Sequence, residues 1–346
     1  MRLIDFRCHW LRQYFPELVA YEHSKDAEVA GRLGELAGYL SAVSAAVLLC
    51  ARDPSEWAAM ADPWPDLHEM IARYQAEFSG RILMGPDDAE RWRREPADGL
   101  CWGLIGVAGF EGLIRNEGDL DHLPTLFERG IRLFQPIGAS GSVLGGSSDA
   151  GDHGGLTTLG KEFLERLTSL VPGQSSSTPR PILDLAGANS FTVNETLDWY
   201  ESNPSARERV LLLASDAAVA TVFFTSDPGT LLTLETVHRL RELGGVVALG
   251  LSRSRIGSPE LLAETIRTLE SIPFEGHKGL EGIAISSDYL GRGGAVGELQ
   301  NAESIMRWFN RTFDRSIARA ILHDQARLLF LKAAGAAEQP AGMLQG

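Results

Sequence analysis

The clearest pattern in this chain is a series of short, nearly continuous apolar runs. The runs are five to eight residues long, and they lack the strict alternation of apolar and polar positions that marks a half-exposed strand. Continuous apolar runs of this length are typical of parallel strands buried on both faces. Eight such runs occur, at residues 2–6, 45–50, 100–107, 130–137, 180–187, 209–216, 244–251 and 281–288.

Amphipathic stretches lie between many of these runs and predict helices. Several begin at a Ser, Thr or Asp that can cap a first turn, and "ELGG" (242–245) is a typical helix end. Repeated strand–helix units predict an α/β protein with a single (β/α)8 TIM barrel. The main competitor is an open doubly wound sheet, but no glycine-rich phosphate loop follows the first run. We expect the barrel to span residues 1–335 and residues 336–346 to form a flexible tail.

Composition changes this picture by excluding functions. The 346-residue chain carries 32 basic and 46 acidic residues, a net charge of −14. Such an acidic chain lacks the basic surface that nucleic acids require, so no nucleic-acid partner is expected. No recognisable secretory leader and no membrane-length apolar segment is present, which predicts a cytoplasmic protein without membrane contact. The three cysteines are too few for a disulfide framework, and we expect them in the core.

Polar residues that follow the predicted strands are the candidates for function, because TIM-barrel sites lie at the C-terminal ends of the strands. Arginines facing aspartates there would suit a carboxylate ligand and would disfavour a cation. With a single histidine in the set, oxygen ligands dominate, and these suit Mg²⁺ or Mn²⁺ better than zinc. Structural roles stay open too, since an Asp after a strand commonly caps the next helix. The candidates are Arg7, His9, Glu111, Asn189, Asp216, Arg253, Asp288 and Tyr289.

Several segments resemble the membrane (renal) dipeptidase family of metal-dependent, amidohydrolase-like TIM barrels. The similarity extends along nearly the whole chain, and it implies the same barrel together with dipeptide hydrolysis at a pair of zinc ions. The segments that carry the resemblance include "LIGVAGFEGL" (104–113), "LPTLFERGIRLFQPI" (123–137), "GGLTTLGKEFLERL" (154–167) and "GIAISSDYLG" (282–291).

The zinc ligands that the resemblance implies are mostly replaced in this sequence. In that family, a His-x-Asp pair, a bridging Glu and two further histidines hold the metal ions, and an Asp on the last strand completes the site. At these positions the chain has Arg7-Cys8-His9, Ala108 (with Glu111 three residues later), Gly187, Asp216 and, unchanged, Asp288; the family's carboxylate-binding arginine falls near His238 and Arg239.

These substitutions favour a barrel that has lost its binuclear zinc site. We expect it to bind or transform a small carboxylate-bearing or peptide-like ligand, for example in a biosynthetic pathway, without a cofactor. The expected substrate-binding residues are Arg7, Asn189, Asp216, Arg253 and Tyr289, and the expected catalytic residues are His9 and Asp288.

Two alternatives remain open at this stage. The first is a metal-dependent dipeptidase or amidohydrolase with a rearranged site, in which His9, Glu111, Asp216 and Asp288 hold one zinc or manganese ion that activates water. The second is a purely structural partner in a larger assembly. A homodimer is compatible with any of these readings, and the sequence marks no interface for it.

Overall fold

The computed structural model describes residues 2–8, 39, 41–52, 54–94, 100–138, 141–148, 152–173, 177–220, 231–272, 279–287 and 296–336. Eight parallel strands follow one another in a single sheet that curls into a nearly closed barrel, in the order β1-β2-β3-β4-β5-β6-β8-β9. Each predicted apolar run overlaps one of these strands, so the predicted (β/α)8 TIM barrel is confirmed. The strands are β1 (Leu3–Cys8), β2 (Val43–Cys50), β3 (Trp102–Ala108), β4 (Ile131–Gln135), β5 (Ile182–Asp184), β6 (Leu211–Val219), β8 (Val246–Gly250) and β9 (Ile283–Ser286).

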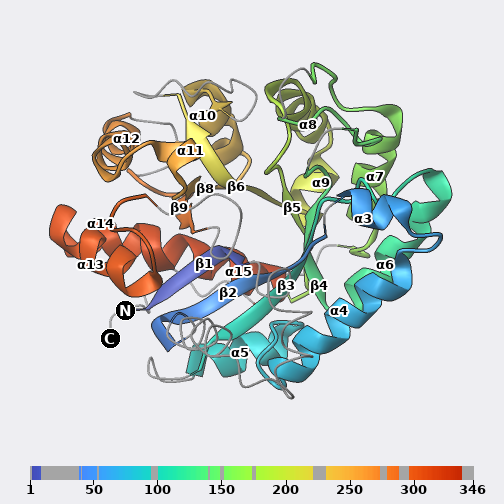
Figure 1. The fold of residues 1–346 in the computed structure, drawn as a ribbon, viewed down its shortest axis with the longest axis horizontal. Coiled ribbons are helices and arrows are strands. Elements are labelled where there is room, and N and C mark those ends of the chain that lie inside the picture. The colour runs from blue at the N-terminus through green and yellow to red at the C-terminus, as the bar shows by residue number, and fades with distance from the viewer. Residues whose placement is uncertain are drawn as a thin grey trace.

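The helices surround the strands (Figure 1). The five helices that the amphipathic stretches predict are all present. Four of them are preceded by a Ser, Thr or Asn cap whose side chain accepts a hydrogen bond from a backbone N–H of the first turn. The helical segments are α3 (Pro54–Ala59), α4 (Trp64–Glu77), α5 (Pro86–Arg94), the 3₁₀ turn η1 (Glu117–Asp121), α6 (His122–Glu128), α7 (Thr158–Ser169), α8 (Ser190–Ser202), α9 (Pro204–Arg209), α10 (Leu234–Glu242), α11 (Arg253–Ile256), α12 (Pro259–Ser271), α13 (Ala302–Thr312), α14 (Arg315–Arg319), the π-helical turn η3 (Ala320–Asp324) and α15 (Gln325–Ala333).

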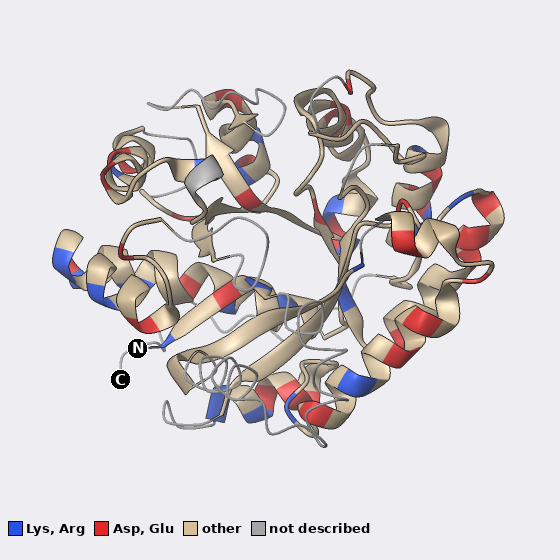
Figure 2. Ribbon diagram, viewed as in Figure 1, with Lys and Arg blue, Asp and Glu red and all other residues tan. Residues whose placement is uncertain are grey.

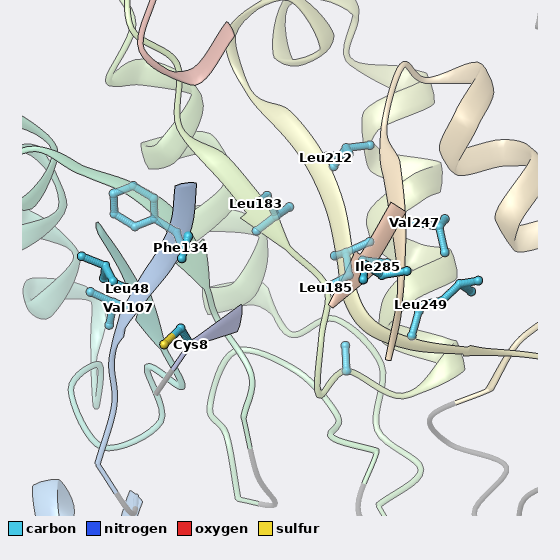
Figure 3. Close-up of a cluster of buried hydrophobic side chains, with 14 of the residues drawn as sticks. Cys8, Leu48, Val107, Phe134, Leu183, Leu185, Leu212, Val247, Leu249 and Ile285 are labelled. Atoms are coloured by element: carbon cyan, nitrogen blue, oxygen red, sulfur yellow. The ribbon is translucent and has the colours of Figure 1, made fainter. Parts of the chain in front are cut away.

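Alternate side chains of each strand enter two separate apolar cores. The outer core joins the outward faces of the strands to the surrounding helices; Figure 3 shows part of it, including Cys8, Leu48 and Phe134. The second core collects residues from strands all around the barrel, such as Ile4 and Leu213. Strands on opposite sides can share one cluster only through the barrel interior, so this second core fills the lumen.

Helix α15 covers the N-terminal end of the barrel. Its Phe330 packs edge-on against the luminal Phe6 with ring centroids 5.5 Å apart. Its last residue, Ala333, accepts a backbone hydrogen bond from Arg180, which lies just before β5. The lumen is therefore sealed at this end by an apolar helix, and its polar end is the opposite one, where the strands terminate.

The junction between the first and last strands of the ring differs from the other junctions. Backbone ladders join each strand of the ring to the next from β1 to β9, but the described residues show no ladder between β9 and β1. A two-residue strand, β7 (Leu231–Leu232), adds to the extended end of β6. The hydrophobic pattern does not predict β7, because two residues are too few to form a recognisable pattern.

Several expectations from composition can be compared with the structure. All three cysteines are buried, as predicted. Within the described ranges, no helix is both long and apolar enough to cross a bilayer. Figure 2 shows the charged residues mainly on the outer helices, with few on the strands. All of the predicted tail except residue 336 lies outside the described residues, so the tail stays a prediction.

Candidate functional site

A bulge in β1 turns Arg7 into the lumen. Asp5 pairs with Ala46 of β2, but the next pairing is Cys8 with Leu48, so β1 has one extra residue in this interval. Phe6 belongs to the luminal core and Cys8 to the outer core. Arg7, between these two residues, points into the lumen as Phe6 does. Its Nη1 donates a 3.0 Å hydrogen bond to Oε1 of Gln135 on β4.

Gln135 positions the Arg7 guanidinium. It ends β4, and its side chain is 1% exposed. Its Nε2 donates to the Ile137 carbonyl oxygen at 2.9 Å, which fixes the amide so that Oε1 faces Arg7. A neutral acceptor therefore orients the guanidinium without adding a negative charge.

Asp184 adds a carboxyl to the same luminal layer. It ends β5 two residues after the luminal Ile182, so alternation directs it inward. Its Oδ1 accepts the Ser215 N–H at 2.9 Å, and its Oδ2 accepts the Ser215 hydroxyl at 2.5 Å. Burial raises the pKa of Asp184, and the charge of Arg7 together with these hydrogen bonds partly opposes the rise. The sequence signal for this residue was an acid within an otherwise apolar run.

Asp216 occupies a strained position on β6. Its φ of +50° is the one positive value among the described non-glycine residues. It lies where the pairing of β6 with β8 is irregular, between Ala214 and Ala217. Its Oδ2 accepts a 3.0 Å hydrogen bond from Arg255 Nε, and a Cβ added to Gly250 would lie 2.3 Å from Oδ1. Asp216 thus sits over the end of β8, paired with Arg255.

Glu111 folds back onto the end of the barrel. Its Oε1 accepts the Gly138 N–H at 2.6 Å, so the carboxylate bridges the loops that follow β3 and β4. The sequence left open whether this residue reaches the strand ends, and the structure places it there. The bond to Gly138 shows a role in holding the two loops together.

Asn189 is part of the scaffold beside this site. Its Oδ1 accepts the Thr192 N–H and caps α8. Its Nδ2 donates to the carbonyl oxygens of Asp152 and Gly154, at 3.0 and 2.8 Å, and the side chain is 2% exposed. These bonds tie the loop after β4 to α8. The predicted substrate-binding role of Asn189 stays untested.

Four further candidates cannot be placed in the site. His9, Asp288 and Tyr289 lie outside the described residues, and for Arg253 the structure gives only its backbone, at the start of α11. Their predicted roles stay predictions. Near the position of the family's carboxylate-binding arginine, Arg239 instead joins α10 to α8, where it pairs with Asp198 and Glu201.

The described residues at the expected zinc positions do not fit a zinc pair. Ala108 offers no donor atom. Gly187 has a φ of +81°, and a Cβ there would lie 2.4 Å from the Ile137 carbonyl oxygen, so this backbone has no room for a side chain. Asp216 is paired with an arginine. Among the residues that the structure describes, no group of three or more His, Cys, Asp or Glu side chains could hold a metal ion.

Known structures share this architecture. The chain aligns over 97% of its length with 99% of the metallopeptidase described as dipeptidase AC, at 18% identity and a TM-score of 0.70. This chain has the same (β/α)8 barrel fold as that protein. A metallopeptidase from Rhodobacter sphaeroides, solved with a phosphinate mimic of the dipeptide L-Ala-D-Ala, matches at 17% identity and a TM-score of 0.68 over 96% of this chain and 99% of its own.

An amidohydrolase from Pseudomonas aeruginosa has the same fold, with 12% identity, a TM-score of 0.66 and coverage of 96% of this chain and 97% of that one. No family model matches the sequence, and no curated protein matches it. The resemblance seen in the sequence is thus confirmed at the level of the fold, and the site must be argued from its own residues.

Proposed function

We propose that this barrel binds a small carboxylate-bearing or dipeptide-like ligand at the C-terminal end of its lumen, and that it does so without a zinc pair. The inward turn of Arg7 carries the proposal. A guanidinium presents its donors in a planar fork that matches a carboxylate, and the low dielectric of a partly buried site strengthens the contact. Gln135 supplies the orientation that such a contact needs.

The chemistry of the lumen supports binding of an anion over binding of a divalent cation. Arg7 brings a permanent positive charge to the layer in which the fold would place metal ions, and like charges repel. Asp216, a carboxylate of the expected ligand set, is paired with Arg255. A dipeptide mimic bound to the Rhodobacter sphaeroides protein supports a ligand of this size and class. If the barrel also catalyses a reaction, His9 or Asp288 is our proposed base.

Calorimetric titration with the dipeptide L-Ala-D-Ala and with its C-terminal amide tests this function. We expect the free acid to bind the wild type and the amide to bind about tenfold or more weakly, because only the acid offers a charge to Arg7. Arg7→Met, which keeps an unbranched apolar side chain but removes the guanidinium and its charge, should weaken binding of the acid by a similar factor. Arg73→Met, at an exposed pair with Glu69 on α4, is the matched control and should bind like the wild type.

Elemental analysis of the same protein, purified without a histidine tag or chelator, completes the test. An Arg7→Met variant that binds the acid like the wild type would overturn the proposed function. Stoichiometric zinc or manganese together with dipeptide hydrolysis would establish the metal-dependent alternative instead.

A further inference from the structure

Ser286, the last residue of β9, has a buried hydroxyl that the scaffold does not use. The residue is 0% exposed. Among the residues that the structure describes, its Oγ has no hydrogen-bond partner. A buried polar atom without a partner costs folding free energy, so such an atom calls for an explanation. Ser215, in the middle of β6, shows the usual solution, because its hydroxyl donates to Asp184.

The Ser286 side chain faces the lumen. Ala284, two residues earlier on β9, belongs to the luminal core, and alternation along the strand gives Ser286 the same direction. The pairing with β8 agrees, since Ser286 lies opposite Gly250, two residues after the luminal Ala248. Gly250 has no side chain, so it cannot supply a partner from that strand.

Ser286 and Arg7 lie on adjacent strand ends. The backbone N–H of Arg7 and that of Ser287 both donate to Oδ1 of Asp5, at 3.3 and 2.8 Å. Two backbones that converge on one oxygen atom are close neighbours. Asp5 and Ser287 point to the outer side of this junction, so Arg7 and Ser286 flank it on the luminal side.

From this placement, and on the basis of the proposed function, we propose that Ser286 is a second ligand-binding residue. Its hydroxyl donates a hydrogen bond to an oxygen of the ligand whose carboxylate pairs with Arg7. The ligand class follows from the two donors: an acid that carries at least two acceptor oxygens close together, as at the C-terminal end of a peptide. The same contact satisfies the hydroxyl that the described part of the chain leaves unbonded.

The test combines binding with thermal unfolding of Ser286→Ala. Removing a hydroxyl that bonds a charged oxygen should weaken L-Ala-D-Ala binding by about tenfold. The ligand-free variant should unfold at the wild-type Tm or about 1 to 3 °C above it, because an unbonded buried polar atom is gone. Ser287→Ala is the matched control. Its hydroxyl donates to Asp5 at 2.5 Å on the outer side, so this variant should lose Tm.

Each outcome decides the proposal. Weaker binding with an unchanged or raised Tm supports it. Unchanged binding overturns it, and so does a lowered Tm, which would mean that the hydroxyl has a structural partner. Arg7→Met, measured in parallel, separates the two proposals: if it loses binding while Ser286→Ala keeps it, the role of Ser286 alone fails. If Arg7→Met binds normally, the proposed function fails.

Discussion

Two buried aspartates clamp neighbouring strands with the same set of hydrogen bonds, but on opposite faces of the barrel wall. Asp5 holds Ser287 through its N–H at 2.8 Å and its hydroxyl at 2.5 Å. Asp184 holds Ser215 through the same two groups, at 2.9 and 2.5 Å. Each carboxyl also accepts the N–H two residues further along its own chain. The local chemistry is nearly identical.

The surroundings give the two clamps different roles. Asp184 joins β5 and β6, which already share a backbone ladder, and it lies in the lumen near Arg7. Asp5 joins β1 and β9, between which the described residues show no ladder, and it also accepts the hydroxyl of Tyr39 in the outer core. The comparison indicates that Asp5 serves mainly to close the barrel, whereas Asp184 serves mainly to make the lumen polar.

The largest expected effect comes from truncating each aspartate. Asp5→Ala removes the side-chain link across the junction without a ladder and leaves buried donors unbonded, so we expect a loss of about 3 to 4 kcal/mol in the free energy of unfolding. Asp184→Ala should cost about 2 kcal/mol, because the ladder between β5 and β6 remains. Denaturant unfolding of both variants measures the difference. Equal losses would contradict the assignment of barrel closure to Asp5.

A smaller effect should appear in the pH dependence of stability. Burial raises the pKa of both Asp5 and Asp184 above the ordinary value of 3.8. A carboxyl with a raised pKa in the folded state favours folding most below its unfolded pKa, and this stabilisation is lost as the pH rises through the folded pKa. Asp5→Asn and Asp184→Asn should therefore each flatten the fall of unfolding free energy above pH 3.8.

Arg7 distinguishes the two clamps in the same measurement. The charge of Arg7 lowers the pKa of Asp184. Arg7 affects the pKa of Asp5 through its backbone N–H instead. Arg7→Met should thus steepen the fall of unfolding free energy with rising pH. The same steepening should appear when Arg7→Met is added to Asp5→Asn, but not when it is added to Asp184→Asn. Steepening that survives in Asp184→Asn would show that Arg7 acts elsewhere.

The smallest effect is expected at Asp216, next to the luminal clamp. Asp216→Gly relieves the positive φ and loses the pair with Arg255, so the two changes nearly cancel. Asp216→Ala loses the pair and keeps the strain, and should be about 1 kcal/mol less stable than the glycine variant. Thermal unfolding of the two variants gives this difference. An alanine variant as stable as the glycine variant would mean that the backbone relaxes at this position.

The sequence predicted the barrel well because each buried parallel strand is a continuous apolar run, which can be recognised without knowing its partners in the fold. It predicted the site less well, because the direction of a side chain depends on register. Strict alternation from Leu3 and Asp5 would turn Arg7 outward, and only the bulge in β1 turns it inward. Asn189 could have been assigned as a helix cap, since it immediately precedes an amphipathic stretch. The bonds of Glu111 and Asp216 join segments that are far apart in sequence, which no local pattern records.

Gly187 limits the single substitutions that this barrel can accept. A histidine there would need a Cβ in space that the Ile137 carbonyl oxygen fills, on a backbone with φ of +81°. Single substitutions at Arg7 or Ala108 could supply donor atoms without moving the main chain, but Gly187→His would first require the segment after β4 to shift. Building a zinc pair at these positions would therefore demand linked changes in two loops, and variants that carry only some of these changes would lose stability before they bound a metal.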